Sequence, residues 1–243
     1  MLKKIFIYIA AIVAGAYLLF AIFFLTKREE GELCKGVEIS ISDGGYGALS
    51  PDNVKKILSD KGINLKGLPI DEISCTNIEK LIGQLPVVEE CQSYKTHKGY
   101  IGINIECKIP IMQAYDAAGR EFFIDKSGAV IDGIHNAMYL PVASGFVTRA
   151  MADKELLKVA MFLEENRFWN EQIEQIYFNE KKEIILVPRI GNHVVEVGKI
   201  DNLEKKLDKL QKFYEKGLNS IGWNKYKKIN VEFDKQVICT KRD

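Results

Sequence analysis

The sequence offers little that could hold a metal ion or a cofactor. It has only three histidines, and His97, His135 and His193 stand in separate turn-like segments. None shows the H-x-x-x-H or H-E-x-x-H spacing that brings two imidazole nitrogens to one metal. The five cysteines form no C-x-x-C pair, which argues against a zinc ribbon or a thioredoxin-like site. Two alternatives stay open for these cysteines: buried free thiols, or one or two disulfide bridges formed in an oxidising compartment. The five residues are Cys34, Cys75, Cys91, Cys107 and Cys239.

Motifs for nucleophilic and phosphate chemistry are missing as well. The run Gly44–Gly47 is followed by Ala-Leu, whereas a phosphate-binding P-loop continues with Lys-Ser/Thr. Ser144 lacks the preceding Gly-x of a nucleophile elbow. Asp125 and Asp132 fall in turn contexts, where aspartate is ordinarily structural. We therefore predict that the chain is not an enzyme, with no catalytic, cofactor-binding or metal-binding residues and no small-molecule substrate.

No excess of either charge is present. The chain has 34 Lys and Arg against 33 Asp and Glu, interspersed along its length, so its net charge is +1. Nucleic-acid binding proteins carry a concentrated basic surface, and none is evident here. Nucleic acid is therefore not an expected partner.

One long apolar run is present, and it lies at residues Ile5–Leu25. An uncharged segment of this length is sufficient to cross the hydrocarbon core as a helix. The rival interpretation, a cleaved signal peptide, has a shorter apolar core and ends in small residues, unlike Phe24-Leu25. We predict an uncleaved anchor in the bilayer, with residues 1–4 as a short cytoplasmic tail. Flanking charges leave its orientation open, but long C-terminal domains are commonly translocated, which favours a cytoplasmic N-terminus.

Residues 34–112 follow the pattern of a β-α-α-β-β domain. Ser50 is a good N-cap ahead of Pro51, and Thr76 and Glu79 have capping-box spacing. Alternating and helical apolar periodicities predict a three-stranded sheet with two helices on one face. The expected elements are a strand over 37–41, helices Pro51–Asp60 and Ile78–Leu85, and a hairpin over 87–109 with its turn at 96–99.

Residues 113–239 predict a second, mixed β-rich domain with two or more helices. Asp116–Gly119 and Asp125–Gly128 are typical of hairpin loops. Apolar stripes predict helices around Leu156–Leu163 and Leu203–Tyr214. The expected strands include Ile173–Phe178, Ile184–Val187, Val194–Val197 and Ile229–Cys239. Because no Pro/Ser-rich linker separates the halves, we expect an α+β protein whose two domains pack closely, with residues 240–243 as a short tail.

Short motifs in a fixed order cover nearly the whole chain after the anchor. They are Leu68–Asp71, Asn77–Leu81, Leu85–Val88, Ile103–Ile111, Phe123–Gly128, Leu140–Gly145 and Tyr226–Val237. In this order the segments resemble the bacterial cell-division family FtsQ, called DivIB in some lineages, in which a POTRA domain precedes a C-terminal β domain. Asn230, Glu232 and Lys108 depart from residues usual in the family, which bears on side-chain contacts rather than on the fold.

The resemblance implies a non-catalytic scaffold of the divisome, located in the inner membrane and enriched at the division septum. The domains after the anchor would lie in the periplasm or outside the cell. They would bind single-pass FtsB- and FtsL-type (DivIC-like) partners and so help to regulate the septal peptidoglycan synthases. Two alternatives are a membrane-tethered envelope enzyme without a recognisable motif and a POTRA-type module of a transport assembly.

The last predicted strand is the candidate binding element. Val231–Cys239 lies near the end of the chain, where we expect an edge strand. An edge strand exposes backbone groups that can pair with an incoming strand. The resemblance implies that an FtsB-type partner docks there. The candidate contact residues are Val231, Phe233, Lys235, Gln236, Val237 and Ile238.

Overall fold

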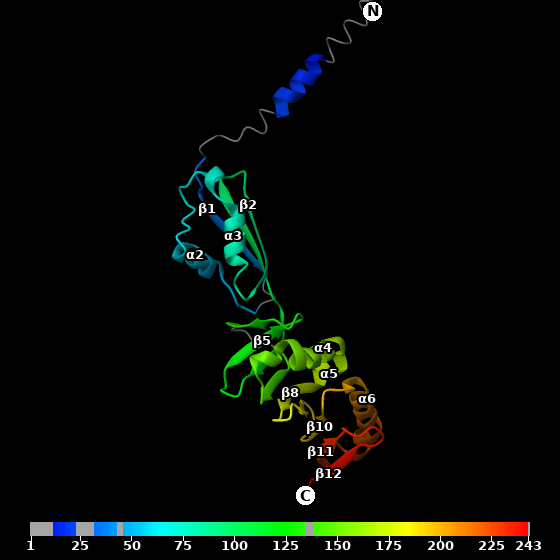
Figure 1. The fold of residues 1–243 in the computed structure, drawn as a ribbon. Coiled ribbons are helices and arrows are strands. Elements are labelled where there is room, and N and C mark those ends of the chain that lie inside the picture. The colour runs from blue at the N-terminus through cyan, green and yellow to red at the C-terminus, as the bar shows by residue number, and fades with distance from the viewer. Residues whose placement is uncertain (1–11, 23–31, 43–45, 135–138, 243) are drawn as a thin grey trace, which may run out of the picture.

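The protein is described by a computed structural model that covers residues 12–22, 32–42, 46–134 and 139–242. After a helix at residues 12–22, two domains follow one another along the molecule, and the C-terminal strands lie at the end far from the helix (Figure 1). The ends of the predicted span Ile5–Leu25 fall outside the described residues. Within the described ranges, no helix has both the length and the apolar character needed to span a bilayer.

The first domain has the predicted β-α-α-β-β order. Its three strands form a sheet in the order β1-β3-β2, in which β1 runs parallel and β2 antiparallel to the central β3. A single turn of 3₁₀ helix, Ile70–Glu72, precedes the second helix. The elements are β1 (Gly36–Ser42), α2 (Pro51–Asp60), α3 (Cys75–Ile82), β2 (Val88–Lys95) and β3 (Tyr100–Cys107).

Both helices begin at serine caps, but only one cap is the predicted one. Ser50 accepts the Asn53 N–H at 3.2 Å, as expected. The second cap is Ser74, so the predicted capping box at Thr76 is wrong. Its Glu79 instead accepts the backbone N–H of Ser93 on the edge strand β2, at 2.7 Å. A half-buried edge donor competes for this carboxylate more effectively than a helix terminus that water can solvate.

The core of this domain lies between the helices and one face of the sheet. Val54 of α2 and Ile82 of α3 are fully buried against Ile101 and Ile103 of β3. The predicted covering of one sheet face by the two helices is therefore confirmed. Leu81, on the same apolar stripe of α3, is only half-buried.

The second domain is a mixed sheet of nine strands among the described residues, in the order β12-β11-β10-β9-β8-β7-β4-β5-β6. Helices pack on one of its faces, where they bury a continuous apolar core (Figure 1). The strands are β4 (Pro110–Tyr115), β5 (Glu121–Asp125), β6 (Val130–Ile131), β7 (Val142–Gly145), β8 (Ile173–Phe178), β9 (Ile184–Pro188), β10 (Val194–Gly198), β11 (Tyr226–Asn230) and β12 (Ile238–Lys241). The helices are α4 (Leu157–Glu165), α5 (Arg167–Gln172), α6 (Leu203–Phe213) and the short α7 (Asn219–Ile221).

Several local predictions for this domain are confirmed, and some elements were missed. The hairpin loops at Asp116–Gly119 and Asp125–Gly128 join β4 to β5 and β5 to β6. The helix α5 was not predicted, nor were the π-helical turns Ala152–Leu156 and Tyr214–Leu218 beside α4 and α6. A π turn needs one extra residue per turn, which apolar periodicity does not reveal.

The prediction of one strand over Ile229–Cys239 is wrong. The chain forms two antiparallel strands there, β11 and β12, with residues 231–237 between them. Val231 leaves the ladder with β12 and donates its N–H to Glu196 on β10, at 2.9 Å. The alternation of apolar residues continues through this segment although the pairing does not: Val231 is buried and Val237 half-buried, whereas Phe233 is exposed.

The two domains share a core, which confirms the expected close packing. Phe123 on β5, Ile131 on β6 and the nearby Ile134 are each at most 5% exposed and belong to the apolar cluster of the first domain. The chain passes from the first sheet to the second at Lys108 and Ile109, just before β4. The first domain therefore sits on the β5–β6 end of the second sheet.

Candidate partner-binding edge

Strand β12 lies at the outer edge of the nine-stranded sheet, and no described strand pairs with its outer side. Its inner side pairs with β11, where Thr240 lies opposite Lys228 and Ile238 opposite Asn230. The position of the edge therefore agrees with the prediction, although the strand itself is shorter and begins later.

Two residues of β12 direct backbone groups to the open side. In an antiparallel ladder, residues alternate between facing the paired strand and facing away from it. Arg242 donates its N–H to the Lys225 carbonyl of the inner neighbour at 3.0 Å. By alternation, Thr240 also faces β11, whereas Cys239 and Lys241 present their N–H and C=O groups to the open edge.

The predicted contact residues do not share one environment. Phe233 is 47% exposed and Ile238 is 45% exposed, as a contact surface requires. Lys235 and Gln236 are exposed in the turn before β12, and Val237 is half-buried against the core. Val231 is fully buried and supports the fold of the hairpin rather than its surface.

A lysine of α6 fixes the loop between β11 and β12. The ammonium group of Lys209 donates to the carbonyl of Val231 at 2.9 Å and also to the carbonyl of Phe233. Burial lowers the pKa of Lys209, and Lys206 acts in the same direction, whereas Asp234 opposes them. These contacts fix the backbone of the loop at Val231 and at the exposed Phe233. Sequence reasoning missed this residue, because a lysine on a helix is ordinarily a solvated side chain.

A buried histidine supports the same end of the sheet. His193 is 3% exposed, and its Nε2 lies 2.9 Å from the Tyr214 hydroxyl. The Tyr214 ring packs edge-to-face on Trp223 with 4.9 Å between the ring centroids. The guanidinium of Arg242 donates to the carbonyl of Asn192, which connects the end of β12 to this cluster.

Acidification is expected to destabilise the C-terminal domain through His193. Burial lowers the pKa of His193, and the charge of Arg242 adds to this, whereas the Trp223 carbonyl opposes it. The unfolded chain therefore binds a proton more readily, near pH ~6.5. The stabilising contribution of the neutral ring is complete above that value and is lost as pH falls through the lower folded-state pKa. Thermal unfolding followed from pH 7.5 to 5.5 should show this loss, and His193→Gln should flatten it; an unchanged pH profile in that variant would contradict the assignment.

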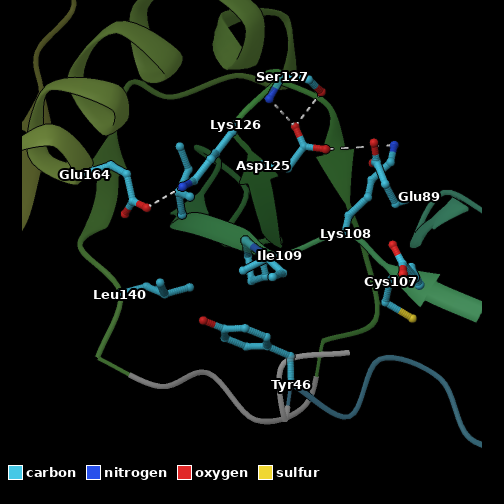
Figure 2. A pocket seen from close by; sticks show the side chains of 13 residues that line it. Tyr46, Glu89, Cys107, Lys108, Ile109, Asp125, Lys126, Ser127, Leu140 and Glu164 are labelled. Carbon is cyan, nitrogen blue, oxygen red and sulfur yellow. Dashed lines mark hydrogen bonds and ion pairs between the residues drawn. The ribbon is translucent and has the colours of Figure 1, made fainter. Parts of the chain in front are cut away.

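A hollow of about 800 Å³ opens at the junction of the two domains. It is lined by side chains of both, with the 54% exposed Ile109 of the connecting segment at its centre (Figure 2). Lys126 pairs with Glu164 of α4 at 2.7 Å. Asp125 accepts the backbone N–H of Ser127 at 2.8 Å within its turn. These contacts tie the β5–β6 turn to its surroundings and account for the aspartate that sequence reasoning placed in a turn.

Other titratable groups show no arrangement for metal binding within the described ranges. No cluster of three or more His, Cys, Asp or Glu side chains that could hold an ion is found there. All five cysteines are free thiols. Burial raises the pKa of Cys91 to about 11, and the neighbouring Glu79 adds to the shift, so this thiol is a poor nucleophile at neutral pH.

Comparison with known families agrees with both domains. Residues 32–106 match the POTRA-like domain family. Residues 109–240, more than half of the chain, match the family described as FtsQ/DivIB, C-terminal related. The chain belongs to this family. In this FtsQ/DivIB-related chain, the boundary between the two matched regions lies at Lys108, where the chain passes from the first sheet to the second. No curated protein matched the sequence.

Membership in the FtsQ/DivIB-related family confirms the resemblance drawn from the short motifs. It suggests a scaffold in cell division, a class that is generally without enzymatic activity. Two features of the candidate edge had no signal in the motifs. The contact between Lys209 and the β11–β12 loop joins segments far apart in sequence, and the outward direction of Cys239 and Lys241 depends on the register with β11.

Proposed function

We propose that this protein is a non-catalytic scaffold of the cell-division machinery that binds an FtsB-type partner by strand addition to β12. The observation that carries the proposal is the open side of β12 at the edge of a family-matched sheet. Backbone pairing at such an edge supplies affinity, and alternate side chains of the added strand supply specificity.

The surroundings of β12 support a partner with alternating apolar residues. Val237 and Cys239 pack toward the helix-covered core, whereas Ile238 is exposed on the other face of the sheet. Phe233, whose backbone carbonyl accepts from Lys209, adds an exposed aromatic side chain in the loop that leads into the strand. An FtsL-type partner and the septal peptidoglycan synthases would then be reached through the FtsB-type protein.

We also propose that residues 5–25 anchor the chain in the inner membrane, with both domains outside the cytoplasm. The support is the length of the apolar run and the helical structure of its central residues, 12–22. Protease added to spheroplasts should digest the domains. A domain protected from protease, or a mature chain that begins after Leu25, would refute this topology.

Replacing Lys241 by proline tests strand addition. Proline removes an N–H that points to the open side, so the pairing with β11 is preserved while a donor to the partner is lost. Co-purification of the FtsB-type protein of the same cell should fall by about tenfold, the value of one or two interfacial hydrogen bonds. The melting temperature of the domain should change little.

Two further variants separate the backbone from the side chain. Lys241→Ala removes the ammonium group but retains the N–H, and it should bind almost as the parent does. Thr240→Pro removes an N–H that faces β11, so it should lower the stability of the hairpin. Full partner binding by a folded Lys241→Pro variant would exclude strand addition at this edge.

A further inference from the structure

Three segments form the end of the POTRA-like domain at which the chain enters it. They are residues 32–35, 66–70 and 96–99, and we call them the entry tip. Cys34 N–H donates to the Leu68 carbonyl at 2.8 Å, and Ile70 N–H donates to the Glu32 carbonyl at 2.9 Å. Lys35 N–H donates to the Gly99 carbonyl at 2.8 Å. The hairpin β11–β12 lies at the opposite end of the molecule (Figure 1).

The entry tip exposes two leucines on a backbone that is held by hydrogen bonds between its segments. Leu33 is 54% exposed and Leu68 is 45% exposed. Their neighbours Cys34 and Ile70 are at most 2% exposed and already fill the adjoining core. The bridge between Leu33 and Pro69 fixes the two segments against each other. The leucines therefore present apolar surface outward from an ordered frame.

Cations accompany these leucines. Lys66 and Lys98 are exposed, and their ammonium groups have no partner among the described residues. The Lys35 ammonium group donates to the Lys98 carbonyl at 2.8 Å and pairs with the Glu32 carboxylate at 3.2 Å. Exposed leucine beside unpaired lysine is the combination that favours a membrane interface. In the sequence, Asp71, Glu72, Lys95 and His97 lie within or next to these segments, and the Lys95 ammonium donates to the Asp71 carbonyl at 3.0 Å.

The length of the chain keeps the entry tip near any bilayer that holds the anchor. Six residues, 26–31, lie between Leu25, the predicted end of the anchor, and Glu32. Even a fully extended chain covers only about 25 Å over the seven residue-to-residue steps that join them. The entry tip is therefore the part of either domain that must lie closest to the lipid headgroups.

We propose that the entry tip docks on the phospholipid surface from which the anchor emerges. Leu33 and Leu68 enter the interfacial layer, while Lys66 and Lys98 face lipid phosphates. This inference rests on the proposed membrane anchoring. Docking holds the two joined domains upright on the bilayer and presents the β12 edge on the side away from it, where an extended segment of a membrane-bound partner can reach it.

Quenching of tryptophan fluorescence by brominated lipids tests this contact. The full chain carrying Leu68→Trp is reconstituted into brominated phosphatidylcholine vesicles that contain phosphatidylglycerol. The matched control is Ile109→Trp, because Ile109 has a similar exposure, 54% against 45% for Leu68, but follows the far end of β3, away from the entry tip. The parent chain, which contains Trp169 and Trp223, gives the background quenching that is subtracted from each variant. We expect the added signal from Leu68→Trp to be quenched at least about twofold more than that from Ile109→Trp.

The possible outcomes distinguish docking of the entry tip from anchoring by residues 5–25. Vesicle flotation reports the anchor: a chain that does not float refutes the anchoring and the docking together. A chain that floats while both variants are quenched equally refutes docking of the tip alone. Adding Lys66→Glu and Lys98→Glu to Leu68→Trp should reduce the quenching while leaving flotation and the melting temperature unchanged. Undiminished quenching in that variant would overturn the role given to the two lysines.

Discussion

Replacing Ile82 by aspartate is expected to destabilise the POTRA-like domain by about 3–5 kcal/mol. Ile82 is fully buried beneath α3, against the isoleucines of β3. An aspartate there would have to be buried without a partner or force the helix from the sheet. Thermal or urea unfolding of the full chain, followed by far-UV circular dichroism, measures the loss.

The next residue of the same helix provides the comparison. Leu81 is only half-buried, so an aspartate at that position can turn its carboxylate to water. Leu81→Asp should therefore cost clearly less than Ile82→Asp. Equal costs for the two variants, or no cost for Ile82→Asp, would show that α3 does not pack as described.

Truncation of Phe123 to alanine is expected to cost about 3–5 kcal/mol, because a large aromatic side chain at a closed site leaves a cavity. Phe123 is 1% exposed and extends from β5 of the second sheet into the core of the first domain. Besides stability, the variant should lose the fixed relation between the domains. A single unfolding transition in the parent and two separate transitions in Phe123→Ala would be the signature in calorimetry.

Phe233→Ala provides the matched aromatic control. Phe233 is 47% exposed on the β11–β12 loop, so its removal should change the stability by less than about 0.5 kcal/mol. The same variant should weaken partner binding if strand addition at β12 is correct. A Phe123→Ala chain as stable as Phe233→Ala would contradict the shared core of the two domains.

The sequence alone was sufficient for elements whose signals are local. Ser50 and Pro51 mark the start of α2, because an N-cap and a first-turn proline act on their own helix. Ile173–Phe178 is rich in β-branched and aromatic residues, is followed by a turn at Asn179-Glu180, and has the predicted bounds of β8. The order of short motifs likewise sufficed for the family, since it depends on spacing and not on contacts.

Tertiary structure decided the features that depend on distant segments. Glu79 binds β2 instead of completing a capping box, because a half-buried edge N–H needs a partner more than a solvated helix end does. The segment after Asn230 reads as one strand, but its pairing stops where Val231 turns toward β10 and Lys209 binds the loop. The open side of β12 and the outward leucines of the entry tip follow from which segments become neighbours. Local periodicity carries no information on that choice, because backbone pairing energy is the same for any strand that arrives in register.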